Sequence, residues 1–119
     1  MRDKPWIGVD LDGTLATYET WESHTHIGKP VEPMVDRVKH WLWLGYDVKV
    51  FTARMSDPDA VRRGEIAAAI QKWTKRHIGV ALQATCVKDY AMLELWDDRA
   101  VQVEANTGQP VGYSTRGFK

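Results

Sequence analysis

Short apolar runs and helix-spaced apolar residues alternate along the first half of the chain. Residues 6–9, Trp-Ile-Gly-Val, are a short apolar run that stops at an acidic stretch. A buried parallel strand has this pattern, and it delivers polar side chains to a site at its carboxyl end. In residues 33–45 apolar side chains recur at three- and four-residue spacing, which predicts a helix with a proline in its first turn and a glycine at its end. Residues 46–51 predict a second strand.

The second half of the chain continues this alternation with one helix and three strands. Residues 57–79 predict a helix that is capped by its first residue, an aspartate, and ends at a glycine. Third and fourth strands are predicted at residues 84–87 and 93–96, and the alternating apolar residues at 101–105 predict a fifth strand at the sheet edge. Strands that alternate with helices predict an α/β fold with a parallel sheet.

The composition is that of one globular domain. The 119 residues are 44% apolar and 27% charged, and a chain of this length forms one domain, residues 1–119. Sixteen basic residues balance sixteen acidic ones, so the chain lacks the overall charge that binds long nucleic acids or anionic membranes. Its single cysteine, Cys86, cannot form an internal disulfide, and no apolar run approaches the roughly 20 residues of a membrane-spanning helix. We therefore expect a cytoplasmic protein without a membrane segment.

Four carboxylates follow two of the predicted strands. Asp10 and Asp12 come after the first strand, and Asp97 and Asp98 come after the fourth. The carboxyl ends of parallel strands share one edge of the sheet, so these side chains can converge there. Like charges at close range raise each other's pKa unless a cation compensates them. Oxygen ligands of this kind select Mg²⁺, which also accepts a phosphate oxygen, so the sequence predicts a Mg²⁺ site.

Two polar residues at other strand ends extend this pattern. Lys88 can neutralise anionic charge near the carboxylates, and Thr52 offers a hydroxyl and a backbone amide. Carboxylates, a metal ion, a lysine and a hydroxyl at one sheet edge are typical of phosphoryl transfer, where catalysis is mostly positioning and charge stabilisation. The sequence leaves open whether the nearby Arg54 contacts substrate or pairs with an acid.

Together these residues resemble the four signature motifs of the haloacid dehalogenase (HAD) superfamily. The match follows chain order and strand-end placement and spans residues 6 to about 108. It rests on the Asp-Leu-Asp-Gly-Thr-Leu sequence of residues 10–15, Thr52-Ala53-Arg54, Lys88 and Asp97-Asp98. The resemblance implies a Rossmann-like, three-layer fold with a central parallel sheet in the strand order 5-4-1-2-3.

The resemblance also implies a role for each aspartate. Asp10 is then the nucleophile and a metal ligand, and Asp12 is the general acid/base, whose backbone carbonyl also contacts the metal. Asp97 is the second carboxylate ligand, and Asp98 binds the metal directly or through water. Phosphatase members of the family carry the second aspartate of the first motif and dehalogenating members lack it, so Asp12 implies phosphotransfer.

The same resemblance implies a phosphate-binding group and an open site. Thr52 and Lys88 resemble the family's phosphate-binding pair, and we assign Gly13 and Arg54 to the same group. Gly13 and Thr52 are 39 positions apart and only 35 residues lie between Thr52 and Lys88, so no cap domain fits. Residues 16–30 then form a short flap beside the site. An open site suits bulky phosphorylated substrates, or a lid borrowed from a neighbouring subunit of a homo-oligomer.

We therefore expect a Mg²⁺-dependent phosphomonoester hydrolase that phosphorylates its own Asp10, while Asp12 protonates the leaving group of a small phosphorylated substrate. One alternative is a nucleotidase or a nucleic-acid 3′-phosphatase of the same fold. In that alternative Tyr18 and Trp21 of the flap stack on the substrate ring, although both residues also suit packing within the domain. Another alternative is a non-catalytic module that binds phosphorylated ligands, but such a module has no need for a general acid at Asp12.

Overall fold

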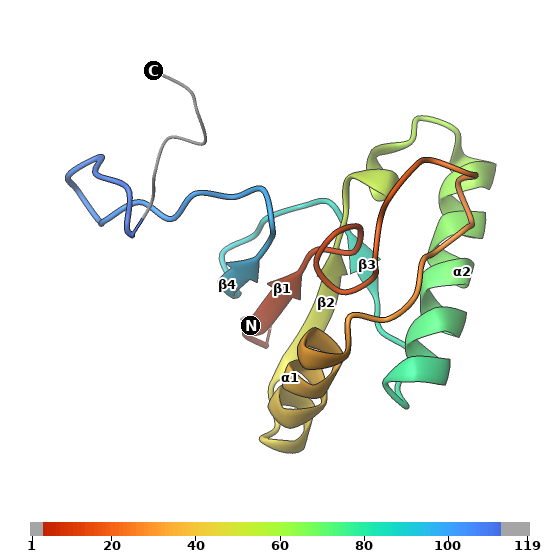
Figure 1. Ribbon diagram of the computed structural model, residues 1–119, viewed down its shortest axis with the longest axis horizontal. Coiled ribbons are helices and arrows are strands. Elements are labelled where there is room, and N and C mark those ends of the chain that lie inside the picture. The colour runs from red at the N-terminus through yellow and green to blue at the C-terminus, as the bar shows by residue number, and fades with distance from the viewer. Residues whose placement is uncertain (1–3, 113–119) are drawn as a thin grey trace.

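A parallel sheet of four strands organises residues 4–112, the part of the chain that the structure, a computed structural model, describes (Figure 1). The sheet order is β3-β2-β1-β4, with every neighbouring pair parallel. The elements in chain order are β1 (Trp6–Val9), α1 (Glu32–Trp43), β2 (Asp47–Phe51), the 3-10 helix η1 (Ala53–Ser56), α2 (Ala60–His77), β3 (Ala84–Thr85) and β4 (Met92–Trp96). The predicted α/β class is confirmed. Neither helix within residues 4–112 is both long and apolar enough to cross a membrane.

One core joins both helices to the same face of the sheet. β1 is buried along its whole length, with a paired strand at each edge, Val9 in the helical core, and Trp6 against the segment that carries Asp89. In β2 only Val48 and Val50 are buried, so this strand turns alternate side chains toward the core. The helices contribute to this core the side chains of Met34, Val35, Val38, Ile66, Ile70 and Trp73.

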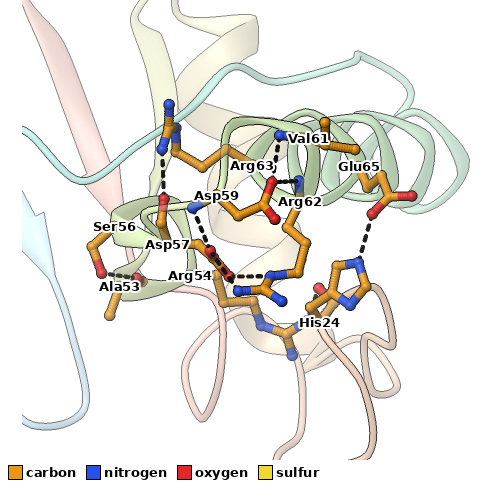
Figure 2. Close-up of polar contacts among 10 residues, drawn as sticks. All are labelled: His24, Ala53, Arg54, Ser56, Asp57, Asp59, Val61, Arg62, Arg63 and Glu65. Atoms are coloured by element: carbon orange, nitrogen blue, oxygen red, sulfur yellow. Dashed lines mark hydrogen bonds and ion pairs between the residues drawn. The ribbon is translucent and has the colours of Figure 1, made fainter.

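Helix α2 begins later than the sequence predicts. Asp59 is its N-cap, and its Oδ1 accepts hydrogen bonds from the backbone amides of Val61 (2.8 Å) and Arg62 (3.2 Å) (Figure 2). Asp57 instead accepts a hydrogen bond from the Asp59 amide and pairs with the Arg62 side chain, and these contacts lower the pKa of Asp57. The predicted cap at Asp57 is therefore wrong, because two nearby aspartates suit a cap and the first of them closes the preceding turn.

The predicted fifth strand at residues 101–105 is also wrong. Val103 forms a single antiparallel bridge with Pro110, and the Val111 amide donates to the Gln102 carbonyl at 2.8 Å. The segment thus turns back on itself, and Figure 1 shows it extending away from the sheet in blue. Its alternating side chains are exposed, so no burial on a sheet face stabilises a strand there. The described residues therefore form a sheet of four strands and not of the five that the resemblance implies.

A loop takes the place of the third layer that the sequence predicts. β3 and β4 lie at opposite edges of the sheet, and only residues 86–91 connect them. Asp89 on this segment accepts a hydrogen bond from Nε1 of Trp6 (2.9 Å), which points away from the helical core. The connection therefore crosses the sheet face opposite the helices. Six residues are too few for a crossover helix, so the described chain has helices on one face.

Candidate active site

Three carboxylates meet at the carboxyl ends of β1 and β4. Carboxylate oxygens of Asp10, Asp97 and Asp98 all lie within 4.8 Å of one another. The Asp10 amide donates to the Trp96 carbonyl (2.8 Å), which holds the two strand ends in register. Burial raises the pKa of Asp10 to about 7, with further contributions from the charge of Asp97 and from hydrogen bonding to Asp98. Without a bound cation, Asp10 therefore keeps its proton to a higher pH than an ordinary aspartate does.

The three acids of the cluster offer only carboxylate oxygens as ligands. No salt bridge joins Asp10 or Asp97 to a lysine, arginine or histidine anywhere in residues 4–112. A divalent cation bound between these carboxylates would offset the repulsion of Asp10 by Asp97. Carboxylate oxygens are the ligands of hard cations such as Mg²⁺, so these three residues fit that ion.

The turn after β1 shapes the cluster through Gly13 and Thr14. The Gly13 backbone has φ +91°, and a Cβ added there would lie 2.7 Å from Oδ2 of Asp98. Thr14 Oγ1 donates to Oδ1 of Asp98 (2.9 Å) and accepts from the Asp98 amide (2.9 Å). Gly13 thus provides room for the Asp98 carboxylate and Thr14 orients it. Sequence reasoning gave Thr14 no role, although its position within the first motif was the available signal.

Asp12 is not a member of the three-carboxylate cluster, because it pairs with Arg54. Arg54 Nε donates to Oδ2 of Asp12 (2.9 Å), and Nη2 donates to Oδ1 (2.8 Å). The Arg54 side chain is only 7% exposed, so this two-point ion pair is largely removed from water. The structure thus answers the question that the sequence left open: Arg54 pairs with an acid.

Arg54 also connects Asp12 at the sheet edge to the flap. Its Nη1 donates to the His24 carbonyl (3.1 Å), and its guanidinium lies 5.2 Å from the ring centroid of Trp21. His24 Nε2 in turn pairs with Glu65 of α2 at 2.9 Å (Figure 2). One arginine therefore contacts the acid Asp12 and two flap residues, and the flap is anchored to α2.

Thr52 directly follows β2, the strand end at which it is predicted, and Lys88 lies beyond β3 on the segment that leads to β4. Thr52 is buried, and its hydroxyl accepts a hydrogen bond from the Arg54 amide (3.2 Å), so it shapes the turn that carries Arg54. Lys88 is exposed on the segment that crosses the sheet, and it forms no ion pair with any residue of the described chain. β3 ends at Thr85, two residues earlier than the predicted strand, so Lys88 does not directly follow a strand.

A cavity of about 870 Å³ lies between the flap and α2 and reaches the site at Asp12 and Arg54. Trp73 forms part of its wall and anchors the flap by donating a hydrogen bond from Nε1 to the Gly28 carbonyl (3.0 Å). Three exposed cations also line it: Lys29, Lys72 and Arg76. Sequence reasoning missed these three because it used only the apolar face of the predicted helix, and their clustering depends on how the flap folds.

Comparisons of the chain with protein-family models, with curated proteins and with solved structures give no match. The interpretation of the site therefore rests on its own geometry and chemistry.

Proposed function

We propose that the chain is a Mg²⁺-dependent phosphomonoester hydrolase of the HAD type, in which Asp10 is transiently phosphorylated. The observation that carries the proposal is the convergence of the carboxylates of Asp10, Asp97 and Asp98 at two adjacent strand ends, two residues from a further acid, Asp12. The central position of β1 and the acid-rich ends of β1 and β4 agree with a Rossmann-like fold of this type.

Asp10, Asp97 and Asp98 would hold the Mg²⁺ ion. When bound, the ion supplies positive charge that favours the ionised, nucleophilic form of Asp10 and balances the charge of the phosphoryl oxygens. The proposed ion is consistent with the absence of a salt bridge between Asp10 and any lysine or arginine of residues 4–112. The acids fit the ion because they provide oxygen ligands from two adjacent strand ends.

Two steps complete the hydrolysis, and the chain's own acids carry both. An Asp10 carboxylate oxygen forms a bond to phosphorus while the bond from phosphorus to the leaving oxygen breaks, and Asp12 transfers a proton to that oxygen. In the second step Asp12 takes a proton from water as the water oxygen bonds to phosphorus. The bond between Asp10 and phosphorus breaks, inorganic phosphate leaves, and both acids return to their starting states.

Arg54 has to release Asp12 before the first step. In the structure both Asp12 oxygens accept hydrogen bonds from Arg54, and Asp12 takes up from solvent the proton that it donates once the guanidinium has moved to the substrate. A phosphoryl dianion offers the guanidinium the same two-point geometry and more charge than a carboxylate. We therefore assign Arg54 to Asp12 in the free protein and to the phosphoryl group in the complex. Arg54 then supplies the positive charge that the sequence assigned to Lys88.

The decisive experiment is turnover of p-nitrophenyl phosphate with Mg²⁺ by the wild type and by Asp10→Asn. An amide cannot form the acyl phosphate, so the variant should lose at least about a thousandfold in kcat. Asp36→Asn changes an exposed carboxylate of α1 and is the matched control, which should keep the wild-type rate. Retention of more than about one per cent of the rate by Asp10→Asn would remove Asp10 as the nucleophile.

A further inference from the structure

The cavity between the flap and α2 has the size and position of a substrate pocket. Its volume, about 870 Å³, lies within the range of roughly 300–1,000 Å³ that is usual for small-molecule sites. Asp12 and Arg54 line it together with flap residues and with the second half of α2. A substrate whose phosphoryl group lies at Asp10 could therefore extend its leaving group into this cavity.

The cavity wall carries more positive charge than its own acids neutralise. Of the carboxylates that line it, Asp12 is paired with Arg54, and Glu22 is paired with His26 at 2.9 Å. That leaves Glu19 as the one further carboxylate of the lining. The lining also contains three cations that form no salt bridge with a described residue: Lys29, Lys72 and Arg76.

The helix itself does not account for both cations on α2. Lys72 and Arg76 are four residues apart on one helix face, a spacing at which like charges repel. Arg76 lies in the last turn, where a cation interacts favourably with the helix dipole, but Lys72 lies outside that turn. An anion bound between the two side chains would turn their repulsion into a shared attraction.

Aromatic side chains of the flap line the same cavity. Trp21 is 55% exposed, and one face of its ring lies against the Arg54 guanidinium. Tyr18, also half-exposed, lies three residues earlier on the flap. Exposed rings beside unpaired cations are the combination that binds the bases and phosphates of nucleotides.

We infer that this cavity binds the nucleoside part and a second phosphate of a bisphosphorylated nucleotide or strand end, whose first phosphate is hydrolysed at Asp10. The base lies against Trp21 and Tyr18, and the second phosphate lies between Lys72 and Arg76. The inference rests on the proposed function only for the fate of the first phosphate, because the cavity would discriminate among nucleotides without turnover. Two sources share this chemistry: a free nucleoside bisphosphate and the phosphorylated end of a nucleic-acid strand.

The test measures binding to the full chain carrying Asp10→Asn, with Mg²⁺, by calorimetry. The ligands are adenosine 3′,5′-bisphosphate and the two adenosine monophosphates, phosphorylated at the 3′ or the 5′ position. We expect the bisphosphate to bind at least about tenfold more tightly than either monophosphate. Adding Lys72→Ala and Arg76→Ala should abolish that preference. Lys75→Ala is the matched control, because Lys75 lies on the same helix but bonds the Gly79 carbonyl (3.2 Å) outside the cavity, and it should keep the preference.

A five-nucleotide DNA with a 3′-phosphate separates the two sources. Tighter binding of this strand than of adenosine 3′,5′-bisphosphate assigns the cavity to a strand end, and the reverse order assigns it to a free nucleotide. Equal affinity for mono- and bisphosphates, or a preference that survives the double substitution, overturns the inference. Turnover is scored separately: a preference without hydrolysis by the wild type keeps the second-phosphate site and overturns the proposed function. Hydrolysis of p-nitrophenyl phosphate by the wild type without a preference for the bisphosphate keeps the proposed function and overturns the second-phosphate site.

Discussion

Asp10 and Asp12 lie in the same turn and have opposite electrostatic surroundings. Asp10 lies against two further carboxylates, which together with burial raise its pKa to about 7. Asp12 accepts two hydrogen bonds from Arg54, so its charge is already balanced by the protein. Within the described part of the chain, Asp10 therefore has no cationic side chain as a salt-bridge partner, whereas Asp12, two residues later, has Arg54.

The difference divides this edge of the sheet into two halves with different electrostatic surroundings. In the half at β1 and β4, no residue within 4–112 forms a salt bridge with Asp10, and our proposal assigns its cation to solution. The half at Asp12 already contains its cation, and Arg54 connects it to the flap. Metal binding should therefore respond to changes in the first half, and substrate recognition to changes in the second.

The largest expected effect comes from a substitution in the second half, at Asp12. Asp12→Asn should lower kcat for an alkyl phosphate such as a sugar phosphate by about a hundredfold or more, because an alkoxide leaving group needs a proton in the transition state. For p-nitrophenyl phosphate the loss should be much smaller, since nitrophenolate leaves without protonation. Steady-state rates on both substrate classes check this prediction. If both classes lose the same factor, Asp12 is not the general acid.

The next effect tests whether the metal belongs to the first half alone. At a hundredfold excess over its dissociation constant, Mg²⁺ should stabilise the wild type by about 2.7 kcal/mol, because the ion binds only the folded cluster. Asp97→Asn should lose most of this gain. Arg54→Gln should keep it, because Arg54 pairs with an acid outside the cluster. Urea unfolding with and without Mg²⁺ provides the values, and a gain retained by Asp97→Asn would remove that residue from the ligands.

Much of the first half could be predicted from sequence, because it depends on strand ends. Residues 6–9 form a strand with the predicted bounds, because the sequence changes abruptly from apolar to acidic residues after this run. Parallel pairing of β1 with β4 then brings Asp10 and Asp97 to the same edge. Alternation alone was not sufficient at Val103, where the segment has no sheet face on which to bury its side chains.

The second half could not be predicted, because it depends on how loops fold. Asp12 and Arg54 are 42 residues apart, and only the path of the turn after β1 decides that this acid faces Arg54 rather than Asp97. The charged lining of the cavity likewise requires the flap to lie along α2. Single side-chain contacts such as that of His24 with Glu65 hold it there. Periodicity contains no information about contacts of this kind.

A smaller effect is expected at Gly13, which lies between the two halves. Gly13→Ala should cost about 2 kcal/mol of stability, because alanine is strained at φ +91° and its Cβ would displace the Asp98 carboxylate. Gly45→Ala is the matched control, with φ +95° and no atom near the added Cβ. It should show the backbone cost alone, about 1 kcal/mol, and keep the full stabilisation by Mg²⁺. Equal losses of stability and of Mg²⁺ response in the two variants would contradict the role of Gly13 beside Asp98.

The smallest effect concerns the charge of Asp10 in the metal-free protein. Because its pKa is raised in the folded state, the proton on Asp10 stabilises the fold fully below pH 3.8, and this contribution is lost as the pH rises through about 7. Asparagine resembles the protonated acid at every pH. Asp10→Asn should therefore be more stable than the wild type at pH 8 by about 1 kcal/mol, a value reduced for partial exposure to solvent, and equally stable at pH 4. Urea unfolding in a chelator at both pH values measures the difference, and Asp36→Asn should show none. Saturating Mg²⁺ should remove or reverse the advantage at pH 8, because the ion favours the ionised carboxylate. An advantage that is the same at pH 4 and pH 8 would mean that Asp10 is not the acid that lacks a cation.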